Sequence, residues 1–241
     1  MIGRITRLLT AFQSNRRVAI RLAKSRGHLG PGSRISPTAQ VLGWRELKIG
    51  NNTLVCDDVC FNINRRNGET QIDIGDQVFI GRSSFFSSGE GIRVGDFSLI
   101  GIGCQFLNAG HINNPLKAYI DSGIESYSVM SIGTNAWLTN HITLIGGVSV
   151  GFGSIVGASS LILEDIPPLA MAAGRPAKVV KLFCWESKQW IKINQTCSID
   201  QQIENHMRRL PSEAEYLSIV CKGDKSRPPL KAMGISQGDI F

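Results

Sequence analysis

The chain of 241 residues contains 42% hydrophobic and 19% charged side chains, which is typical of a folded globular protein. The net charge of +7 lies in one segment: residues 1–26 hold seven of the 26 basic residues and no acid, and the other 19 balance 19 acids. This distribution excludes a general nucleic-acid-binding surface. No apolar run reaches the roughly 18 residues of a membrane helix, and no secretory h-region follows the N-terminus, so we expect a cytoplasmic protein.

The six cysteines include no Cys-x-x-Cys pair, and the four histidines are scattered among them. This pattern predicts neither a zinc site nor a disulfide framework. We therefore expect reduced thiols and no metal.

Residues 1–26 have the pattern of a basic amphipathic helix. Ile5, Leu8, Leu9 and Phe12 have helical spacing, with arginines on the other face. Such a helix can make peripheral contact with an anionic membrane, cap the open end of a repeat stack, or dock on a neighbouring subunit. The sequence leaves these alternatives open.

The central part of the chain carries a six-residue repeat. Large aliphatic side chains recur at every sixth position: Ile132, Leu138, Leu144, Val150, Val156 and Ile162. Six residues fit neither the helical period of 3.6 nor the strand period of 2, but they fit a chain that turns a corner after each short strand. Three such sides form one coil of about 18 residues in a parallel β-helix, with each inward residue stacked on the one 18 positions away.

The same register continues upstream with interruptions: Ile49, Val55 and Phe61; Ile74, Ile80 and Phe86; Val94, Ile100, Phe106 and Ile112; and, more weakly, Ile35, Val41 and Leu47. Glycine follows several of these residues, as tight corners favour. A β-sandwich is the alternative, but its strands would alternate with period 2. We therefore predict an all-β solenoid.

Two polar loops interrupt the repeat, at residues 65–69 and 113–131, and the longer loop is the better candidate for a functional segment. Prolines predict the end of the repeat at residues 165–168. One or two helices, broken near Pro211, are expected within 182–221. The predicted organisation is a basic helix with its linker (1–29, the linker reaching residue 37), a β-helix domain (30–181), and a helical extension with a flexible tail (182–241).

His111 stands directly before the longer loop, in the run Asn108-Ala109-Gly110-His111. An imidazole near neutral pH can take a proton from an alcohol and return it to a leaving group. A lone histidine in a loop is more often an ordinary surface residue, and His141, near a buried row position, is its competitor.

Four motifs stand out in the segment 94–181: Val94-Gly95-Asp96 with the later Gly110-His111; Ile132-Gly133-Thr134-Asn135-Ala136-Trp137; the run of Gly146-Gly147-Val148, Val150-Gly151 and Val156-Gly157-Ala158; and Asp165-Ile166-Pro167-Pro168 with Gly174-Arg175-Pro176-Ala177-Lys178. In these motifs the segment resembles the hexapeptide-repeat acetyltransferases, in particular the maltose/galactoside and polysaccharide O-acetyltransferases.

The resemblance implies a left-handed parallel β-helix, a homotrimer, and a groove shared between neighbouring subunits. In that groove His111 would be the general base that activates a sugar hydroxyl toward acetyl-CoA. The matching positions for the co-substrate are Trp137, Asn140, Ala158, Lys178 and Lys181. Asp121, Glu125 or a backbone carbonyl would orient the imidazole.

The chain also departs from the family pattern. The family's Asn one coil before the base is replaced by Gly81-Arg82-Ser83-Ser84, and its usual Thr-Lys before Asp-Ile-Pro-Pro is Leu163-Glu164. We therefore take Arg82, Ser83 and Asp121 as candidate acceptor contacts. The departures favour a capsule, exopolysaccharide or lipopolysaccharide sugar over a free oligosaccharide.

Two other classes remain open at this stage. An N-acetyltransferase of an amino sugar would use the same coil, although its relatives often carry a nucleotide-sugar domain with no counterpart here. A non-catalytic β-helix module or a γ-class carbonic anhydrase would share the fold. The anhydrase needs three histidine ligands, whereas His111 and His141 lack the close third partner.

Overall fold

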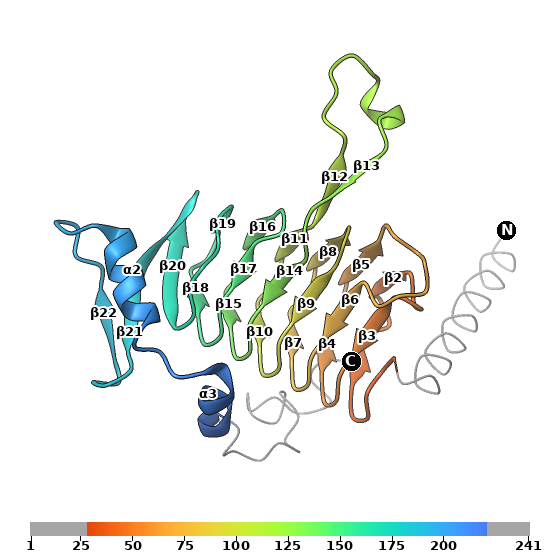
Figure 1. Ribbon diagram of the computed structural model, residues 1–241. Helices are drawn as coiled ribbons and strands as arrows, with labels where there is room; N and C mark the ends of the chain where they lie inside the picture. The colour runs from red at the N-terminus through yellow and green to blue at the C-terminus, as the bar shows by residue number, and fades with distance from the viewer. Residues whose placement is uncertain (1–27, 221–241) are drawn as a thin grey trace, which may run out of the picture.

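The computed structural model describes residues 28–220 and shows the predicted solenoid of stacked parallel strands (Figure 1). Short strands lie on three sides of each coil and form three sheets. The nine-stranded sheet contains β1 (Arg34–Ile35), β4 (Leu54–Val55), β7 (Phe79–Ile80), β10 (Leu99–Ile100), β15 (Trp137–Leu138), β18 (Ile155–Val156), β20 (Ala170–Gly174), β21 (Ala177–Cys184) and β22 (Gln189–Lys192). The six-stranded sheet contains β2 (Gln40–Leu42), β5 (Cys60–Ile63), β8 (Phe85–Ser88), β11 (Gln105–Leu107), β16 (Thr143–Ile145) and β19 (Leu161–Ile162). The five-stranded sheet contains β3 (Leu47–Ile49), β6 (Ile72–Ile74), β9 (Ile92–Val94), β14 (Met130–Ile132) and β17 (Ser149–Val150).

The six-residue repeat places its large residues inside the coils, as predicted. Ile132 pairs with Val150, Leu138 with Val156, and Leu144 with Ile162, so each stacks on the residue 18 positions later. These six side chains are buried. The stacking of parallel strands is consistent with the expected left-handed β-helix.

The interior of the six-stranded sheet contains a column of aromatic rings. Phe61 stacks on Phe86 with ring centroids 4.9 Å apart, and Phe86 stacks on Phe106 at 4.2 Å. All three side chains are fully buried. Aromatic stacking adds to the free energy of apolar burial, so this column ties three successive coils together.

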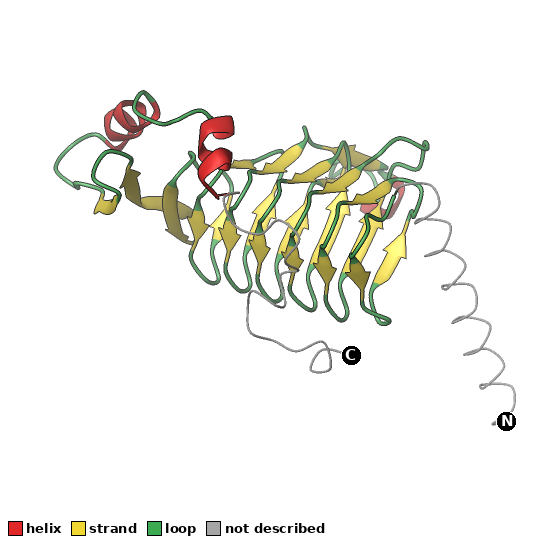
Figure 2. Ribbon diagram, turned by 90° about the horizontal axis from the view of Figure 1, so that it is seen from below, coloured by secondary structure: helices red, strands yellow, loops and turns green. Residues whose placement is uncertain are grey.

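The three sides of the prism meet at three edges, each a stack of turns (Figure 2). The edge between the nine- and six-stranded sheets is called the Asn140 edge and contains the turns at 82–83, 102–103, 140–141 and 158–159. The edge between the six- and five-stranded sheets is called the arm edge. The edge between the five- and nine-stranded sheets is called the Asp96 edge and contains the turns at 51–52, 76–77, 96–97 and 134–135.

A long hairpin leaves the arm edge and projects from the body (Figure 1). Its limbs are β12 (Ala109–His111) and β13 (Ile124–Ser126), which pair antiparallel, and a short 3-10 helix, η1 (Tyr119–Asp121), lies in its distal part. We call residues 109–127 the arm. It corresponds to the predicted long loop, but it begins earlier than expected. Ile112 was therefore wrongly predicted as a buried row residue: it is 46% exposed because the chain has already left the coil.

Three predicted boundaries are corrected by the structure. The first coil already includes residues assigned to the linker, because Leu29 forms a bridge with Ile49 and β1 follows. Parallel stacking continues past the prolines, which lie in a turn, and β20 pairs with β18 as a further strand. The segment β21–β22, at 177–184 and 189–192, is an antiparallel pair and not helix.

Two helices follow as predicted on either side of Pro211: α2 (Ile199–Met207) and α3 (Glu213–Val220). Tyr216 of α3 packs on Phe152, and its hydroxyl accepts a hydrogen bond of 2.6 Å from Asn135. The extension therefore folds back on the Asp96 edge. The predicted N-terminal basic helix and the C-terminal tail lie outside the described residues, and no helix of the described part is long and apolar enough to cross a membrane.

Candidate active site

His111 is the last residue of β12, where the arm leaves the body. It pairs across the hairpin with Ile124, and its side chain is exposed. Within residues 28–220 no hydrogen bond reaches the imidazole. Of the three groups expected to orient it, Asp121 lies in η1 and Glu125 pairs with the neighbouring Gly110, so neither is bonded to His111 in a single chain.

The Asn140 edge is a ladder of backbone hydrogen bonds that brings four predicted residues into one row. Gly103 N–H donates to the Arg82 carbonyl at 3.0 Å, His141 N–H donates to the Ile102 carbonyl at 2.7 Å, and Ser159 N–H donates to the Asn140 carbonyl at 2.9 Å. Arg82 and Ser83, the candidate acceptor contacts, thus lie two coils from Asn140, and Ala158 lies one coil beyond it. The competitor His141 is on this same edge.

Two polar groups on this edge have N–H donors that find no acceptor in the described chain. The Asn140 side-chain oxygen accepts a 2.9 Å hydrogen bond from Ile102 N–H, which leaves its amide NH₂ group without an acceptor in the described chain. The backbone N–H of the exposed Ala158 likewise donates to no described group. Amide carbonyls of an extended ligand are natural partners for such donors.

The Asn140 edge ends at a cationic turn between β20 and β21. Arg175 donates a 3.2 Å hydrogen bond from Nη1 to the Ser159 carbonyl, beside Ala158. Lys178, on β21, forms an exposed ion pair with Glu164, with 2.8 Å between Nζ and Oε2. Arg175 was part of the quoted motif but was not predicted as a site residue. Its contact depends on a turn that only folding places beside Ala158.

Trp137 and Lys181 share the outer face of the nine-stranded sheet instead. Trp137 pairs with Ile155, Ile155 with Met171, and Met171 with Lys181. Trp137 is 45% exposed. Together with Phe79 and Leu99 in the same register, this row gives the sheet an apolar outer strip.

A single chain does not bring His111 to the Asn140 edge. β11 runs from one edge to the other, and its three residues span about 10 Å, so the six-stranded sheet separates the imidazole from Asn140 and Ala158. The predicted base and the predicted co-substrate residues therefore form two half-sites on different edges.

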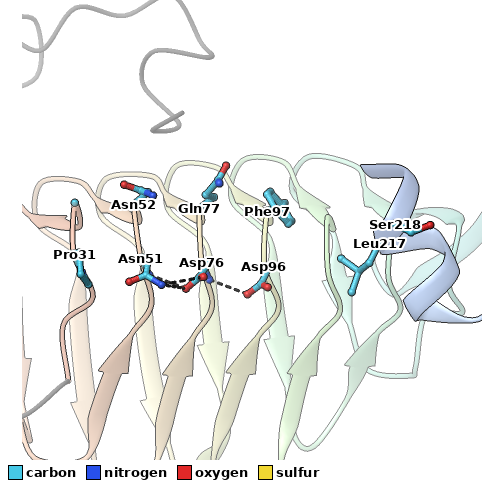
Figure 3. Close-up of a pocket in the computed structure, with 10 residues that line it drawn as sticks. Pro31, Asn51, Asn52, Asp76, Gln77, Asp96, Phe97, Leu217 and Ser218 are labelled. Carbon is cyan, nitrogen blue, oxygen red and sulfur yellow. Dashed lines mark hydrogen bonds between the residues drawn. The ribbon is translucent and has the colours of Figure 1, made fainter. Parts of the chain in front are cut away.

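The third edge carries a separate groove. A hollow of about 550 Å³ lies between the Asp96 edge and α3, with Leu217 and Ser218 on its helical side (Figure 3). On the coil side the Asp76 carboxylate accepts from Asn51 N–H at 2.7 Å, and the Asp96 carboxylate accepts from Asp76 N–H at 2.8 Å. None of the predicted site residues lines this groove. No cluster of three metal-ligating side chains is found in residues 28–220.

Comparison with known proteins gives relatives that match part of the chain. No protein-family model matches the chain. A Staphylococcus aureus protein that carries the name acetyltransferase is 37% identical over 111 residues, which is 46% of this chain and 54% of that protein. The galactoside O-acetyltransferase of Escherichia coli is 29% identical over 126 residues, 45% of this chain and 62% of that enzyme. The predicted resemblance is confirmed.

Among solved structures, AntD, an N-acyltransferase from Bacillus cereus crystallised with dTDP and 3-hydroxybutyryl-CoA, has a TM-score of 0.56 and 19% identity. The match covers 83% of this chain and 95% of that chain. At this identity the likeness establishes the shared fold. The chain spans only 54% and 62% of the length of the two curated relatives.

Proposed function

We propose that this protein is an acetyl-CoA-dependent O-acetyltransferase that acetylates a sugar hydroxyl of a capsule, exopolysaccharide or lipopolysaccharide precursor. The proposal is carried by the presence of two half-sites in one chain. One is the exposed His111, and the other is the Asn140 edge, which offers N–H donors and ends at cationic side chains. Partial matches to relatives named acetyltransferase support it.

The Asn140 edge suits the extended shape of acetyl-CoA. The spare NH₂ group of Asn140 and the spare N–H of Ala158 would donate to the pantetheine amides. Arg175 and Lys178 would hold phosphate groups at the end of the row, with charge-assisted hydrogen bonds. An exposed ion pair contributes at most about 1 kcal/mol, so a phosphate can displace Glu164 from Lys178. Lys181 and Trp137 would contact the co-substrate from the neighbouring outer face.

His111 would act as general base and then as general acid. Its imidazole takes the proton of the sugar hydroxyl while the hydroxyl oxygen bonds to the thioester carbon. The resulting tetrahedral oxyanion needs a nearby backbone N–H donor. Collapse of this intermediate breaks the carbon–sulfur bond, and the imidazolium returns its proton to the departing thiolate. The products are the acetyl ester and CoA, with no covalent enzyme intermediate.

The separation of the two half-sites favours a ring of subunits. In a homotrimer, His111 of one subunit would face the Asn140 edge of the next. The arm supports this arrangement, because Leu116 and Ile120 are 92% and 84% exposed and a two-stranded hairpin is marginal alone in water. The apolar strip that includes Trp137 offers a second surface for a neighbour to cover. A head-to-tail contact that closes on itself gives a ring.

The acceptor assignment rests on the relatives and on the Asn140 edge. One relative is named galactoside O-acetyltransferase. Arg82 and Ser83 lie on the same edge as Asn140 and are exposed, so they can contact sugar hydroxyls next to the thioester. An amino sugar would use the same half-sites, and an acceptor panel that contains hydroxyl and amino sugars distinguishes the two reactions.

The test is the turnover of His111→Ala, followed as release of the CoA thiol in the presence of the acceptor panel. We expect kcat to fall by roughly 10²–10⁴-fold while acetyl-CoA still binds, because only the proton transfer is lost. His141→Asn, which suits that residue's φ of 58°, tests the competing histidine. Turnover of His111→Ala within a few-fold of the parent would refute the assignment of the base.

A further inference from the structure

Asn108 is a fully buried amide at the root of the arm, three residues before His111. Its NH₂ group donates to the carbonyls of Ser128, at 2.7 Å, and Gly146, at 3.1 Å. Its side-chain oxygen accepts from the N–H groups of Gly89 and Gly91, each at 3.2 Å. The side chain therefore uses both donors and both acceptor positions of a carboxamide.

The four partners of Asn108 come from three different parts of the fold. Gly89 and Gly91 belong to the turn of the preceding coil, Ser128 belongs to the returning limb below the arm, and Gly146 belongs to the following coil. One side chain thus links the coils before and after the arm to the arm's own return. Buried amides with all partners satisfied specify one arrangement, because any other leaves polar groups without partners.

The backbone around Asn108 leaves little room for another position of the arm. A Cβ at Gly89 would come within 2.6 Å of the Asn108 carbonyl oxygen and 3.0 Å of the Ser126 Cα. Asn108 N–H also donates to the Ser87 carbonyl at 2.9 Å, and Tyr127 N–H donates back to the Asn108 carbonyl at 3.3 Å. Both limbs of the arm are therefore attached at the same residue.

We propose that Asn108 is the positioning residue of the arm and, through it, of His111. This inference rests on the proposed function, since the His111 imidazole has no hydrogen-bonded partner in the described chain and takes its place from β12. A displacement of about 1 Å at a reacting group lowers turnover by about 100-fold, so fixing the root of the arm matters for rate and not for co-substrate affinity.

The experiment compares Asn108→Ala with Ser154→Ala, a matched loss of a fully buried polar side chain. Ser154 donates to the Pro167 carbonyl at 2.7 Å and accepts from Ala170 N–H on the Asp96 edge. Two readouts are used: hydrogen exchange of the amides at 109–126, and kcat with KM for acetyl-CoA. We expect Asn108→Ala to accelerate exchange in the arm and lower kcat by about 100-fold, with KM within about twofold. Ser154→Ala keeps the parental arm exchange and kcat, even if its melting temperature falls.

Two further variants keep the test decisive. Asn108→Asp retains the shape but lacks both N–H donors, and it should behave as Asn108→Ala does. Gly89→Ala keeps the Asn108 side chain but displaces the root, because the added Cβ would meet the Asn108 carbonyl oxygen at 2.6 Å, and it should give the same split between kcat and KM if Asn108→Ala does not fold. Unchanged arm exchange, or a kcat loss matched by Ser154→Ala, would overturn the inference. If the arm loosens in Asn108→Ala while His111→Ala remains active, the proposed function fails and the positioning of the arm stands.

Discussion

Two inactive variants should restore activity when they are mixed, if each site is built from two chains. His111→Ala removes the base but leaves the Asn140 edge intact. Ala158→Trp puts a large ring on an exposed turn of that edge, where it blocks the co-substrate without entering the core. In a ring assembled at random from equal amounts, a site works when an intact base from one variant meets an intact edge from the other. Each condition has a chance of one half, so roughly one quarter of all sites should be active, and in mixed trimers alone about one site in three should be active.

The assay is CoA release by co-expressed, differently tagged chains, purified through both tags so that only mixed assemblies are measured. Each variant alone, carrying both tags, is the control and should be inactive. A site contained in one chain predicts no recovery, because every chain lacks one half. Mixed assemblies of confirmed composition with activity no higher than the controls would refute the shared groove, and sedimentation of the parent as a monomer at micromolar concentration would refute the ring itself.

The Glu164–Lys178 pair and the Cys56 thiol each support one further prediction. Glu164→Gln should lower KM for acetyl-CoA by up to about fivefold, because an exposed ion pair that competes with phosphate is worth at most about 1 kcal/mol, and a rise in KM would contradict this role. Joint replacement of Lys178 and Lys181 by Ala should raise that KM and leave acceptor KM unchanged. Burial, aided by Asp57 and opposed by Arg82, raises the pKa of Cys56 from 9.0 to about 11, so folding favours the neutral thiol. That stabilisation is complete below pH 9 and is lost as pH rises to about 11. The melting temperature should therefore fall more steeply over this pH window in the parent than in Cys56→Ser. Equal slopes of melting temperature against pH in the two proteins would show that Cys56 is not the cause.

The period of the apolar residues was enough to predict the coils, because a side chain in the narrow prism points either inward or outward. Leu138 illustrates the rule: its inward direction follows from spacing alone, and it stacks between Ile100 and Val156. Ile112 shows where the rule stops, because a residue in correct register can belong to a hairpin that has left the coil.

The other corrections have local physical causes. Prolines 167 and 168 lie in a turn where no ladder donor is needed, so the coil continues through β20. The apolar residues of 182–192 alternate between the faces of a short antiparallel pair, in which Leu182 lies opposite Ile191 and Phe183 lies opposite Trp190. The secondary structure of such short segments depends on the strand with which they pair, and the local sequence does not identify that strand.

The candidate site was predictable in its chemistry but not in its connections. His111, Asn140, Ala158 and Lys178 were identified through motif resemblance, and their roles are still predictions. Asn108, Arg175 and the Glu164–Lys178 pair depend on contacts between residues 14 or more positions apart. Such contacts become visible only when successive coils are stacked.

The resumption of register after the arm has a consequence for how this protein can diversify. Val94 pairs with Ile132 across the arm in the same way that Ile132 pairs with Val150 across an ordinary coil. The pairing of the coils is therefore independent of the length of the segment between them. Doubling the length of a flexible loop costs only about 0.6 kcal/mol. The length and tip of the arm can therefore be changed without redesigning a buried position of the coils, so the surface that the arm presents can evolve, or be engineered, separately from the stability of the coils.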